Sequence, residues 1–284
     1  MIVITGATGQ LGRLVIDGLL EKVPAERVAA VVRDRDRAAD LAARGVQLRI
    51  ADYDRPETLR DAFRAGEKVL LISGTEAGRR VPQHTAVVDA ARRAGVALLA
   101  YTSVLGGPEA DFLLADDHRE TERVILGSGL PHVLLRNGWY HENYTGQLAT
   151  ALEHGAVLGS AGEGRIASAS RADFAAAAVA VLTGEGHENR AYELSGDVAW
   201  SLAEYAAEVT RLSGREVVYR ELPPAAYQEV LVGAGVPEPM AAILVDVDAA
   251  IARGRLAGTS GDLRRLIGRP TTPLADAIAA ALKG

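Results

Sequence analysis

The sequence contains no cysteine among its 284 residues and only three lysines. Without cysteine, disulfides, thiolate zinc sites and cysteine nucleophiles are all excluded. The six histidines show no metal-ligand spacing, so no metal is expected. No lysine directly follows a glycine, which excludes a phosphate-binding P-loop, and no Gly-x-Ser-x-Gly motif occurs. Hydrolase, kinase and metalloenzyme functions therefore lack support in the sequence.

The chain also lacks a long basic cluster and a long hydrophobic run. Its net charge is −6, and aspartates interrupt its short basic clusters, as between Arg33 and Arg37. Proteins that bind nucleic acids usually carry a basic face, so we expect no nucleic-acid partner. No run approaches roughly 18 apolar residues, and no basic segment followed by an apolar stretch begins the chain. We therefore expect no membrane span, no signal peptide and a cytoplasmic protein.

What the sequence does contain is a regular alternation of short apolar runs and longer amphipathic segments. Strands are predicted at residues 2–5, 28–32, 46–50, 69–72, 96–101 and 133–135, with helices between them. Nearly continuous apolar strands that alternate with helices indicate a parallel sheet covered on both faces. The prediction is an α/β fold with a Rossmann-type doubly wound sheet, in which ligands bind beyond the carboxyl ends of the strands.

The alternation becomes less regular in the second half of the chain, where glycines cluster between Gly155 and Gly164. The chain length suggests one large domain or one domain with a smaller companion. We predict an NADP-binding domain at residues 1–149 and a smaller C-terminal α/β lobe, on the substrate side, at 150–284. Residues 165–183, which include an alanine-rich helix, are expected to cross back onto the first domain.

A glycine-rich loop follows the first predicted strand and precedes a helix. It reads Gly6-Ala7-Thr8-Gly9-Gln10-Leu11-Gly12. One glycine permits a tight turn, one lets the backbone approach a pyrophosphate, and one allows the helix to pack closely on the sheet. The first-turn amides and the helix dipole then favour the negative charge. The loop predicts a dinucleotide site, whereas the alternative is a glycine turn without a ligand.

The end of the second predicted strand indicates which dinucleotide is bound. An acidic residue there hydrogen-bonds the ribose of NAD, and an arginine accommodates the 2′-phosphate of NADP. The strand runs into Arg33 and then Asp34. A guanidinium can pair with a phosphate in a bidentate manner, so Arg33 favours NADPH. Two alternatives stay open: Arg33 is a surface residue paired with Asp34 or Asp36, or Asp34 binds a ribose.

With these features in hand, the chain resembles the NmrA-like branch of atypical short-chain dehydrogenases. It is most similar to the type 2 NADPH:quinone oxidoreductases, relatives of triphenylmethane reductase. Most short-chain dehydrogenases use Tyr-x-x-x-Lys as a general acid, and this chain has Gly18, Arg64 and Ala279 four positions before its lysines. The resemblance runs from end to end, in segments 4–12, 100–103, 135–140, 142–144, 167–169, 171–173 and 192–194.

The resemblance implies which residues contact the cofactor. Together with the loop, the implied set is Gly6, Ala7, Thr8, Gly9, Gln10, Leu11, Gly12, Arg33, Ser73, Gly74, Thr75, Asn137, Gly138, Trp139, Tyr140, His141, Glu142 and Arg171. The family more often has serines at 73–75, so Gly74 can contribute only its backbone. His141 stands where a serine is expected. Ser73, Ser103 and Asn137 are predicted to follow the fourth, fifth and sixth strands, at the ligand-binding edge.

The resemblance also implies a reaction, the reduction of quinones by direct hydride transfer from NADPH without flavin. A quinone is a strong electrophile and needs less proton assistance than a ketone, which is consistent with the missing tyrosine–lysine pair. Candidate donors to the developing oxyanion are Tyr140, His118, Asn143 and Ser103. The alternatives for two of these are a helix-surface histidine at His118 and a helix cap or turn at Ser103.

Two other functions stay open on the sequence alone. One is a reductase of triphenylmethane dyes or other aromatic electrophiles. The other is an NmrA-like NADP(H) sensor that binds the cofactor without chemistry and contacts a regulator. The expected partner is otherwise a small aromatic electrophile, and a homodimer is left open.

Overall fold

The computed structural model describes residues 1–76 and 78–283 of the chain. These residues form two compact units. The first unit comprises residues 1–107, 117–137 and 171–193, and the second comprises 108–116, 138–170 and 194–284. The domain boundary that the sequence predicts at residue 149 stays a prediction.

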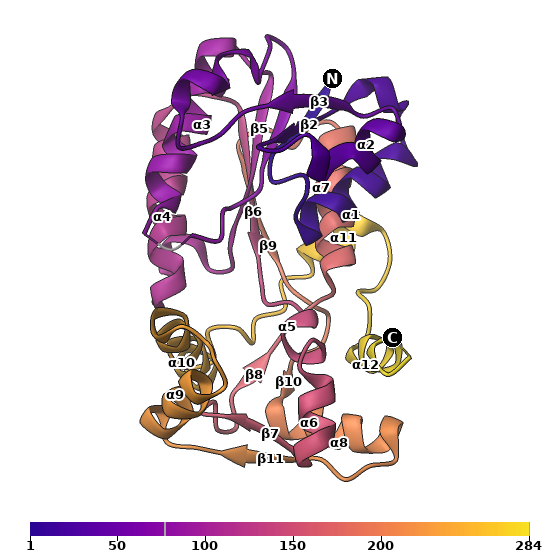
Figure 1. Ribbon diagram of the computed structural model, residues 1–284, viewed down its shortest axis with the longest axis vertical. Helices are drawn as coiled ribbons and strands as arrows, with labels where there is room; N and C mark the ends of the chain where they lie inside the picture. Colours follow the sequence, from indigo (N-terminus) through magenta and orange to yellow (C-terminus); the bar gives the residue numbers. More distant parts are fainter. Residues whose placement is uncertain (77, 284) are drawn as a thin grey trace. The chain divides into compact units, whose positions relative to one another are not determined.

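The first unit is built on a seven-stranded sheet in the order β3-β2-β1-β4-β5-β6-β9 (Figure 1). The strands are β1 (Ile2–Ile4), β2 (Val28–Val32), β3 (Gln47–Ile50), β4 (Lys68–Leu71), β5 (Leu98–Val104), β6 (His132–Asn137) and β9 (Arg190–Leu194). All pairings from β3 to β6 are parallel. The predicted α/β class with a doubly wound sheet is confirmed, and the strand order reverses between β1 and β4, where such folds bind ligands.

Helices cover both faces of this sheet, as Figure 1 shows. On one side lie α1 (Gln10–Leu20), α2 (Ala39–Ala43) and α7 (Arg171–Thr183), and on the other lie α3 (Arg80–Ala94) and α4 (Leu113–Gly127). Short 3-10 helices occur at Ala25–Arg27, Asp36–Ala38, Pro56–Asp61 and Gly107–Glu109. The central strands are buried because both faces are covered, which explains their nearly continuous apolar sequences.

Two boundaries differ from the sequence prediction. Strand β5 extends to Val104, which pairs with Asn137, so Ser103 lies inside the strand and not after it. The strand continues through polar residues because their side chains find partners: Thr102 Oγ1 accepts a hydrogen bond from Ser73 N–H. The sequence predicts a helix at residues 84–94, whereas α3 begins four residues earlier at Arg80, because Pro82 in the first turn needs no helical amide bond.

The second unit contains two small sheets and seven helices within its described residues. Strands β7 (Ala156–Gly159) and β11 (Val218–Glu221) pair in parallel, and β8 (Arg165–Ile166) pairs antiparallel with β10 (Trp200–Ser201). The helices are α5 (Glu142–Thr145), α6 (Leu148–His154), α8 (Leu202–Ser213), α9 (Pro224–Gly233), α10 (Glu238–Ala252), α11 (Asp262–Ile267) and α12 (Leu274–Ala281).

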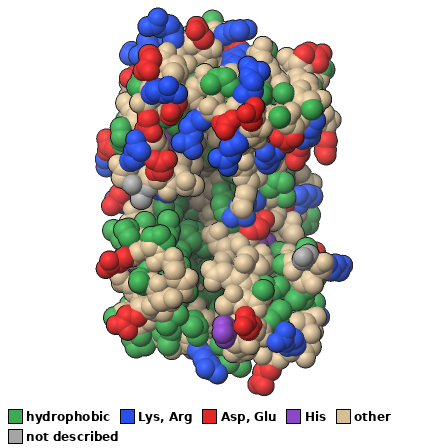
Figure 2. All heavy atoms as spheres, viewed as in Figure 1, with side chains coloured by type: hydrophobic (Ala, Val, Ile, Leu, Met, Phe, Trp, Pro, Cys, Tyr) green, Lys and Arg blue, Asp and Glu red, His purple; other side chains and the backbone are tan. Residues whose placement is uncertain are grey.

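Charged residues of both signs are interspersed on the face shown in Figure 2, over the part of the chain that carries the seven-stranded sheet. In the second unit, α9 and α10 expose the hydrophobic side chains of Val230, Val232 and Met240. Within the described residues, every helix is too short or too polar to cross a lipid bilayer.

Candidate functional site

The glycine loop between β1 and α1 is held by its own backbone. Gly6 adopts a left-handed conformation with φ of 59°, and its carbonyl accepts a hydrogen bond from Gly9 N–H at 3.0 Å. A Cβ atom at Gly12 would lie 2.3 Å from Gly6 O and 2.8 Å from Ala7 Cα. Position 12 therefore accepts no side chain without moving the loop, and this close packing gives the third glycine its role.

The start of α1 presents backbone amides at this loop. Gly9 is the N-cap residue and has no side chain to satisfy them. Arg13 N–H donates back to Gly9 O at 3.0 Å, and the amides of Gln10, Leu11 and Gly12 precede it in the first turn. First-turn amides have no partner within their own helix, and the helix dipole makes this end positive. The arrangement suits an anionic group such as a pyrophosphate.

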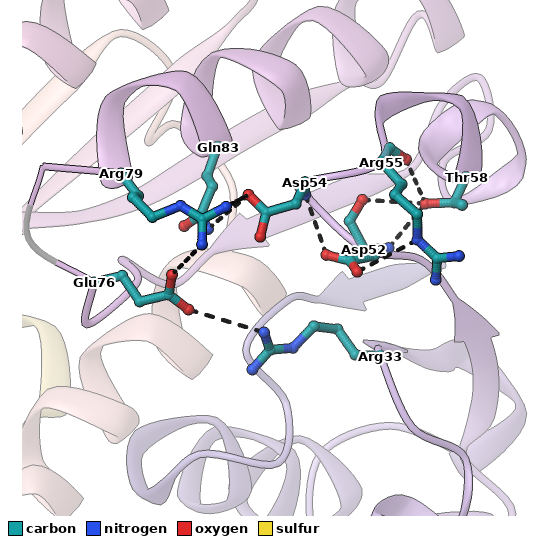
Figure 3. Close-up of polar contacts among 8 residues, drawn as sticks. All are labelled: Arg33, Asp52, Asp54, Arg55, Thr58, Glu76, Arg79 and Gln83. Carbon is teal, nitrogen blue, oxygen red and sulfur yellow. Dashed lines mark hydrogen bonds and ion pairs between the residues drawn. The ribbon is translucent and has the colours of Figure 1, made fainter.

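Arg33 follows β2 and lies in a network of charged side chains drawn in Figure 3. Its guanidinium lies 3.9 Å from a carboxylate oxygen of Glu76. The other oxygen of Glu76 lies 3.3 Å from Arg79, which also pairs with Asp54 at 2.8 Å. The ion pair of Arg33 is thus with Glu76, whereas the alternative drawn from the sequence was a pair with Asp34 or Asp36. Asp34 instead accepts the backbone N–H of Asp36.

The segment after β4 is fixed by side chains of α3. Gly74 N–H donates to His84 Nε2 at 3.0 Å, and Gly74 O accepts from Arg80 Nε at 2.7 Å. Because Nε2 accepts, the proton of the neutral ring is on Nδ1, which lies 3.0 Å from Thr121 Oγ1. Burial, with a smaller contribution from the charge of Arg80, lowers the pKa of His84 to about 4. Both the N–H and the carbonyl group of Gly74 are therefore hydrogen-bonded to side chains of α3.

Replacing His84 by leucine is expected to lower the free energy of unfolding by about 1–3 kcal/mol, because Gly74 N–H loses a buried acceptor. Urea unfolding of the wild-type protein and the variant at neutral pH measures this. His84→Gln keeps an acceptor on a side chain of similar reach and should recover part of the loss. Equal stability of the leucine variant and the wild-type protein would show that this hydrogen bond contributes nothing.

Ser103 belongs to a buried ionic network in the first unit. Its hydroxyl donates to Glu122 at 2.6 Å, and Arg136 donates both to Glu122 and to Glu193. A Cβ atom at Gly107 would lie 2.2 Å from the Arg136 guanidinium carbon, so the turn after β5 rests directly on this arginine. Neither alternative role for Ser103, a helix cap or a turn, is found, since the residue lies within β5.

His118 is buried in α4 and is not on the helix surface, so the surface alternative is wrong. Its Nδ1 lies 2.8 Å from the hydroxyl of Tyr101. Burial, followed by the charges of Arg80 and His84, lowers the pKa of His118 to about 3. Burial also raises the pKa of Tyr101. Both groups are therefore neutral near pH 7, and His118 can assist a reaction only as a neutral hydrogen-bond donor or acceptor.

The second unit holds the segment that follows β6. Tyr140 forms a parallel bridge with Ala169, and His141 N–H donates to Ala169 O at 3.0 Å. His141 is buried, with Nε2 lying 3.0 Å from Thr272 O and Nδ1 lying 2.7 Å from Ser168 Oγ. Ser168 Oγ also accepts the indole N–H of Trp200. The unexpected histidine thus ties this segment to two other parts of the same unit.

The predicted site residues fall in both units. The first unit contains the glycine loop, Arg33, Ser73, Gly74, Thr75, Ser103, His118, Asn137 and Arg171, and the second contains Gly138, Trp139, Tyr140, His141, Glu142 and Asn143. Asn137 is buried, and its side-chain oxygen has no hydrogen-bond partner within the described residues. A buried acceptor without a partner is costly, which makes this oxygen a candidate ligand atom.

Sequence reasoning did not single out Glu76, His84 or Asp248. Asp248 lies in α10, and its carboxylate accepts the Ser160 backbone N–H at 2.7 Å. Burial, with the charge of Glu221, raises the pKa of Asp248 to about 6. No local motif marks these residues, because each one interacts with a segment distant in the sequence or with a loop whose course depends on the fold. The one available signal was the pair of aspartates, Asp246 and Asp248, that interrupts an otherwise apolar stretch of α10.

Comparisons with known proteins agree with this geometry. A family model described as NAD(P)H-binding matches residues 6–185, which include the glycine loop, Arg33 and Asn137. The chain belongs to this NAD(P)H-binding family. The matched stretch contains the glycine loop together with β2 and β4, whose carboxyl ends lead into the predicted cofactor contacts.

Relatives of this NAD(P)H-binding protein match it over nearly its whole length. Quinone oxidoreductase 2 of Escherichia coli (strain K12) is 48% identical, over 98% of this chain and 97% of the relative. The crystal structure of the NADPH-dependent quinone oxidoreductase from Escherichia coli complexed with NADPH matches with a TM-score of 0.97, 48% identity and coverage of 99% and 100%. The Citrobacter sp. triphenylmethane reductase complexed with NADP(H) matches with a TM-score of 0.95, 41% identity and the same coverage.

Proposed function

We propose that this protein reduces quinones with NADPH. The observation that carries the proposal is the 48% identity to a quinone oxidoreductase over 98% of the chain. The predicted class, an NAD(P)H-dependent oxidoreductase, agrees with the family, and the missing tyrosine–lysine pair fits an acceptor that needs little proton assistance. In this proposal, the protein mainly binds the coenzyme and the acceptor, orients them and excludes water from the site. Acid catalysis by its side chains contributes less.

The residues of the first unit fit a dinucleotide. Gly12 lets the start of α1 pack closely on the glycine loop, the first turn of α1 supplies amides, and Arg33 supplies a guanidinium. Asn137 adds a buried oxygen that a donor of the ligand could satisfy. When bound, the reduced nicotinamide supplies a hydride to an electrophilic carbonyl system. Further contacts are proposed from Ser73, Thr75 and Arg171, and from residues 138–142.

Four side chains are proposed as donors to the oxyanion that develops on the acceptor. Ser103 and His118 are already engaged, with Glu122 at 2.6 Å and Tyr101 at 2.8 Å. Using Ser103 as a donor would break a charge-assisted hydrogen bond, which costs more than a neutral one. Ser103 and His118 also hold the carboxyl end of β5 and α4 in place. Tyr140 and Asn143, which follow β6, are proposed as donors in addition to them.

Replacing Arg33 by alanine is expected to weaken NADPH binding by about 1.5–3 kcal/mol, the contribution of hydrogen bonds to a charged group. NADH lacks the 2′-phosphate, so its affinity should change little. Calorimetric titration of both coenzymes with the wild-type protein and the variant measures the difference. Equal losses for NADPH and NADH would contradict a contact between Arg33 and the 2′-phosphate.

A second candidate function is the reduction of triphenylmethane dyes, favoured by the match to triphenylmethane reductase at 41% identity and a TM-score of 0.95. Steady-state oxidation of NADPH against a panel of simple quinones and dyes separates the two functions. Turnover of quinones supports the proposal, and turnover of dyes alone supports the second candidate. Tight NADPH binding without turnover of any acceptor would instead support the redox sensor.

A further inference from the structure

Glu76 occupies an unusual position for a protein that is to bind a phosphate near Arg33. Its carboxylate lies between two guanidinium groups, 3.9 Å from Arg33 and 3.3 Å from Arg79 (Figure 3). Arg33 follows β2, Glu76 lies after β4, and Arg79 directly precedes α3. A negatively charged group from the chain thus already sits on the guanidinium that a 2′-phosphate would need.

The network also provides a second place for the Glu76 carboxylate. Arg79 is held by Asp54 at 2.8 Å, and Asp54 in turn accepts from Gln83 at 3.1 Å (Figure 3). Arg79 is therefore positioned independently of Arg33. A carboxylate displaced from Arg33 can keep its contact with Arg79, so displacement does not leave it without a cation.

We infer that Glu76 competes with the 2′-phosphate for Arg33 and thereby sets how strongly the protein prefers NADPH over NADH, with Arg79 retaining Glu76 once it is displaced. The inference rests on the proposed NADPH-dependent function and adds a residue that tunes coenzyme specificity. The side chains of the Arg33–Glu76 pair are 66% and 42% exposed, respectively. Water therefore screens this ion pair and makes it weak. A ligand can break a weak pair at little cost in free energy.

The test is calorimetric titration of NADPH and NADH with Glu76→Gln. The variant should bind NADPH about two- to fivefold more tightly, the range expected when one exposed ion pair is removed as a competitor. NADH should bind with unchanged affinity. Because the interaction is exposed, the gain should shrink between about 50 mM and 500 mM salt. Glu57→Gln removes an exposed acidic charge elsewhere in the same unit and should leave both affinities unchanged.

Arg79→Ala tests the second half of the inference. Without Arg79, Glu76 should stay on Arg33, and NADPH should bind more weakly than to the wild-type protein. In the Glu76→Gln background the same substitution should have no effect, because Arg79 then has no carboxylate from position 76 to hold. A loss that persists in the double variant would show that Arg79 contacts the phosphate directly, and it would overturn the proposed role of Arg79 in retaining Glu76.

Three further results would overturn the competition between Glu76 and the 2′-phosphate. NADPH affinity could fall in Glu76→Gln, which would make Glu76 a cofactor ligand. Both coenzymes could gain equally, which would reduce its effect to general repulsion. Neither affinity could change, which would leave no competition. Failure of the wild-type protein to bind NADPH at all is a different outcome, because it would remove the proposed function itself.

Discussion

Gly12→Ala should weaken NADPH binding by about 10- to 100-fold, the loss expected when hydrogen bonds to a charged group, which contribute about 1.5–3 kcal/mol, are displaced. The new Cβ atom would lie 2.3 Å from Gly6 O and 2.8 Å from Ala7 Cα, and both are backbone atoms. Neither atom can turn away as a flexible side chain would. The loop or the start of α1 has to shift, and the amides that we propose to bind the pyrophosphate shift with it. Calorimetric titration with NADPH measures the loss.

The control for this substitution is Gly127→Ala at the end of α4. A Cβ atom there meets nothing within 4 Å, so the variant should bind NADPH as the wild-type protein does. Alanine also favours a helix over glycine, so its stability should be equal or slightly higher. If Gly12→Ala retained wild-type affinity while remaining folded, as judged by circular dichroism, the glycine loop would not be the pyrophosphate site.

Asp248→Asn should raise the free energy of unfolding by about 3 kcal/mol at pH 8, because two pKa units correspond to about that energy. In the folded protein, burial and the charge of Glu221 raise the pKa of Asp248 from 3.8 to about 6. At pH 8 the carboxylate is charged and poorly solvated. Asparagine keeps an oxygen that can accept the Ser160 N–H without that charge.

The direction of the pKa shift of Asp248 determines how the free energy of unfolding depends on pH. A carboxyl with a raised pKa in the folded state favours folding below pH 4, and this contribution is lost as the pH rises from about 4 to 6. The two proteins should therefore be similarly stable at pH 4 and diverge toward pH 8. Chemical unfolding at several pH values checks this, with Glu238→Gln at the start of α10 as the control. A wild-type protein at least as stable as Asp248→Asn at pH 8 would contradict the burial argument.

The sheet of the first unit was predictable from the sequence because its signal is local. Strands buried on both faces are apolar along their whole length, and the six runs predicted as strands all became strands of the parallel sheet. The sequence also predicts a C-cap at Gly95 for the helix at 84–94, and the structure has glycine there in a left-handed conformation with φ of 69°. These features depend on neighbours in the chain and on burial alone.

The second unit was harder to predict because its elements are short and depend on distant partners. Strand β8 has two residues, and its pairing with β10 joins positions 166 and 200. Helices α5, α6, α11 and α12 were not predicted, and the glycine-rich stretch from 155 to 164 concealed β7. Helix α8 is an exception, because its amphipathic sequence predicts a helix at residues 201–213, and in the structure a capping box of Ser201 and Glu204 fixes its start.

The same contrast between local signals and distant contacts applies to the charged and buried polar residues. Arg33 could be placed from the sequence because its role depends on the end of one strand. Its pairing with Glu76 could not, because that contact needs the carboxyl ends of β2 and β4 to lie at the same sheet edge. For His118 the surface alternative stayed open on the sequence, because no local pattern shows that Tyr101 lies beside it.

A crystal structure of this protein grown with NADPH would test the central claim most directly. The account predicts the pyrophosphate against the amides of residues 9–12 and the 2′-phosphate on Arg33, with Glu76 moved off that guanidinium. A coenzyme bound elsewhere, or one bound at the loop with its 2′-phosphate away from Arg33, would contradict it.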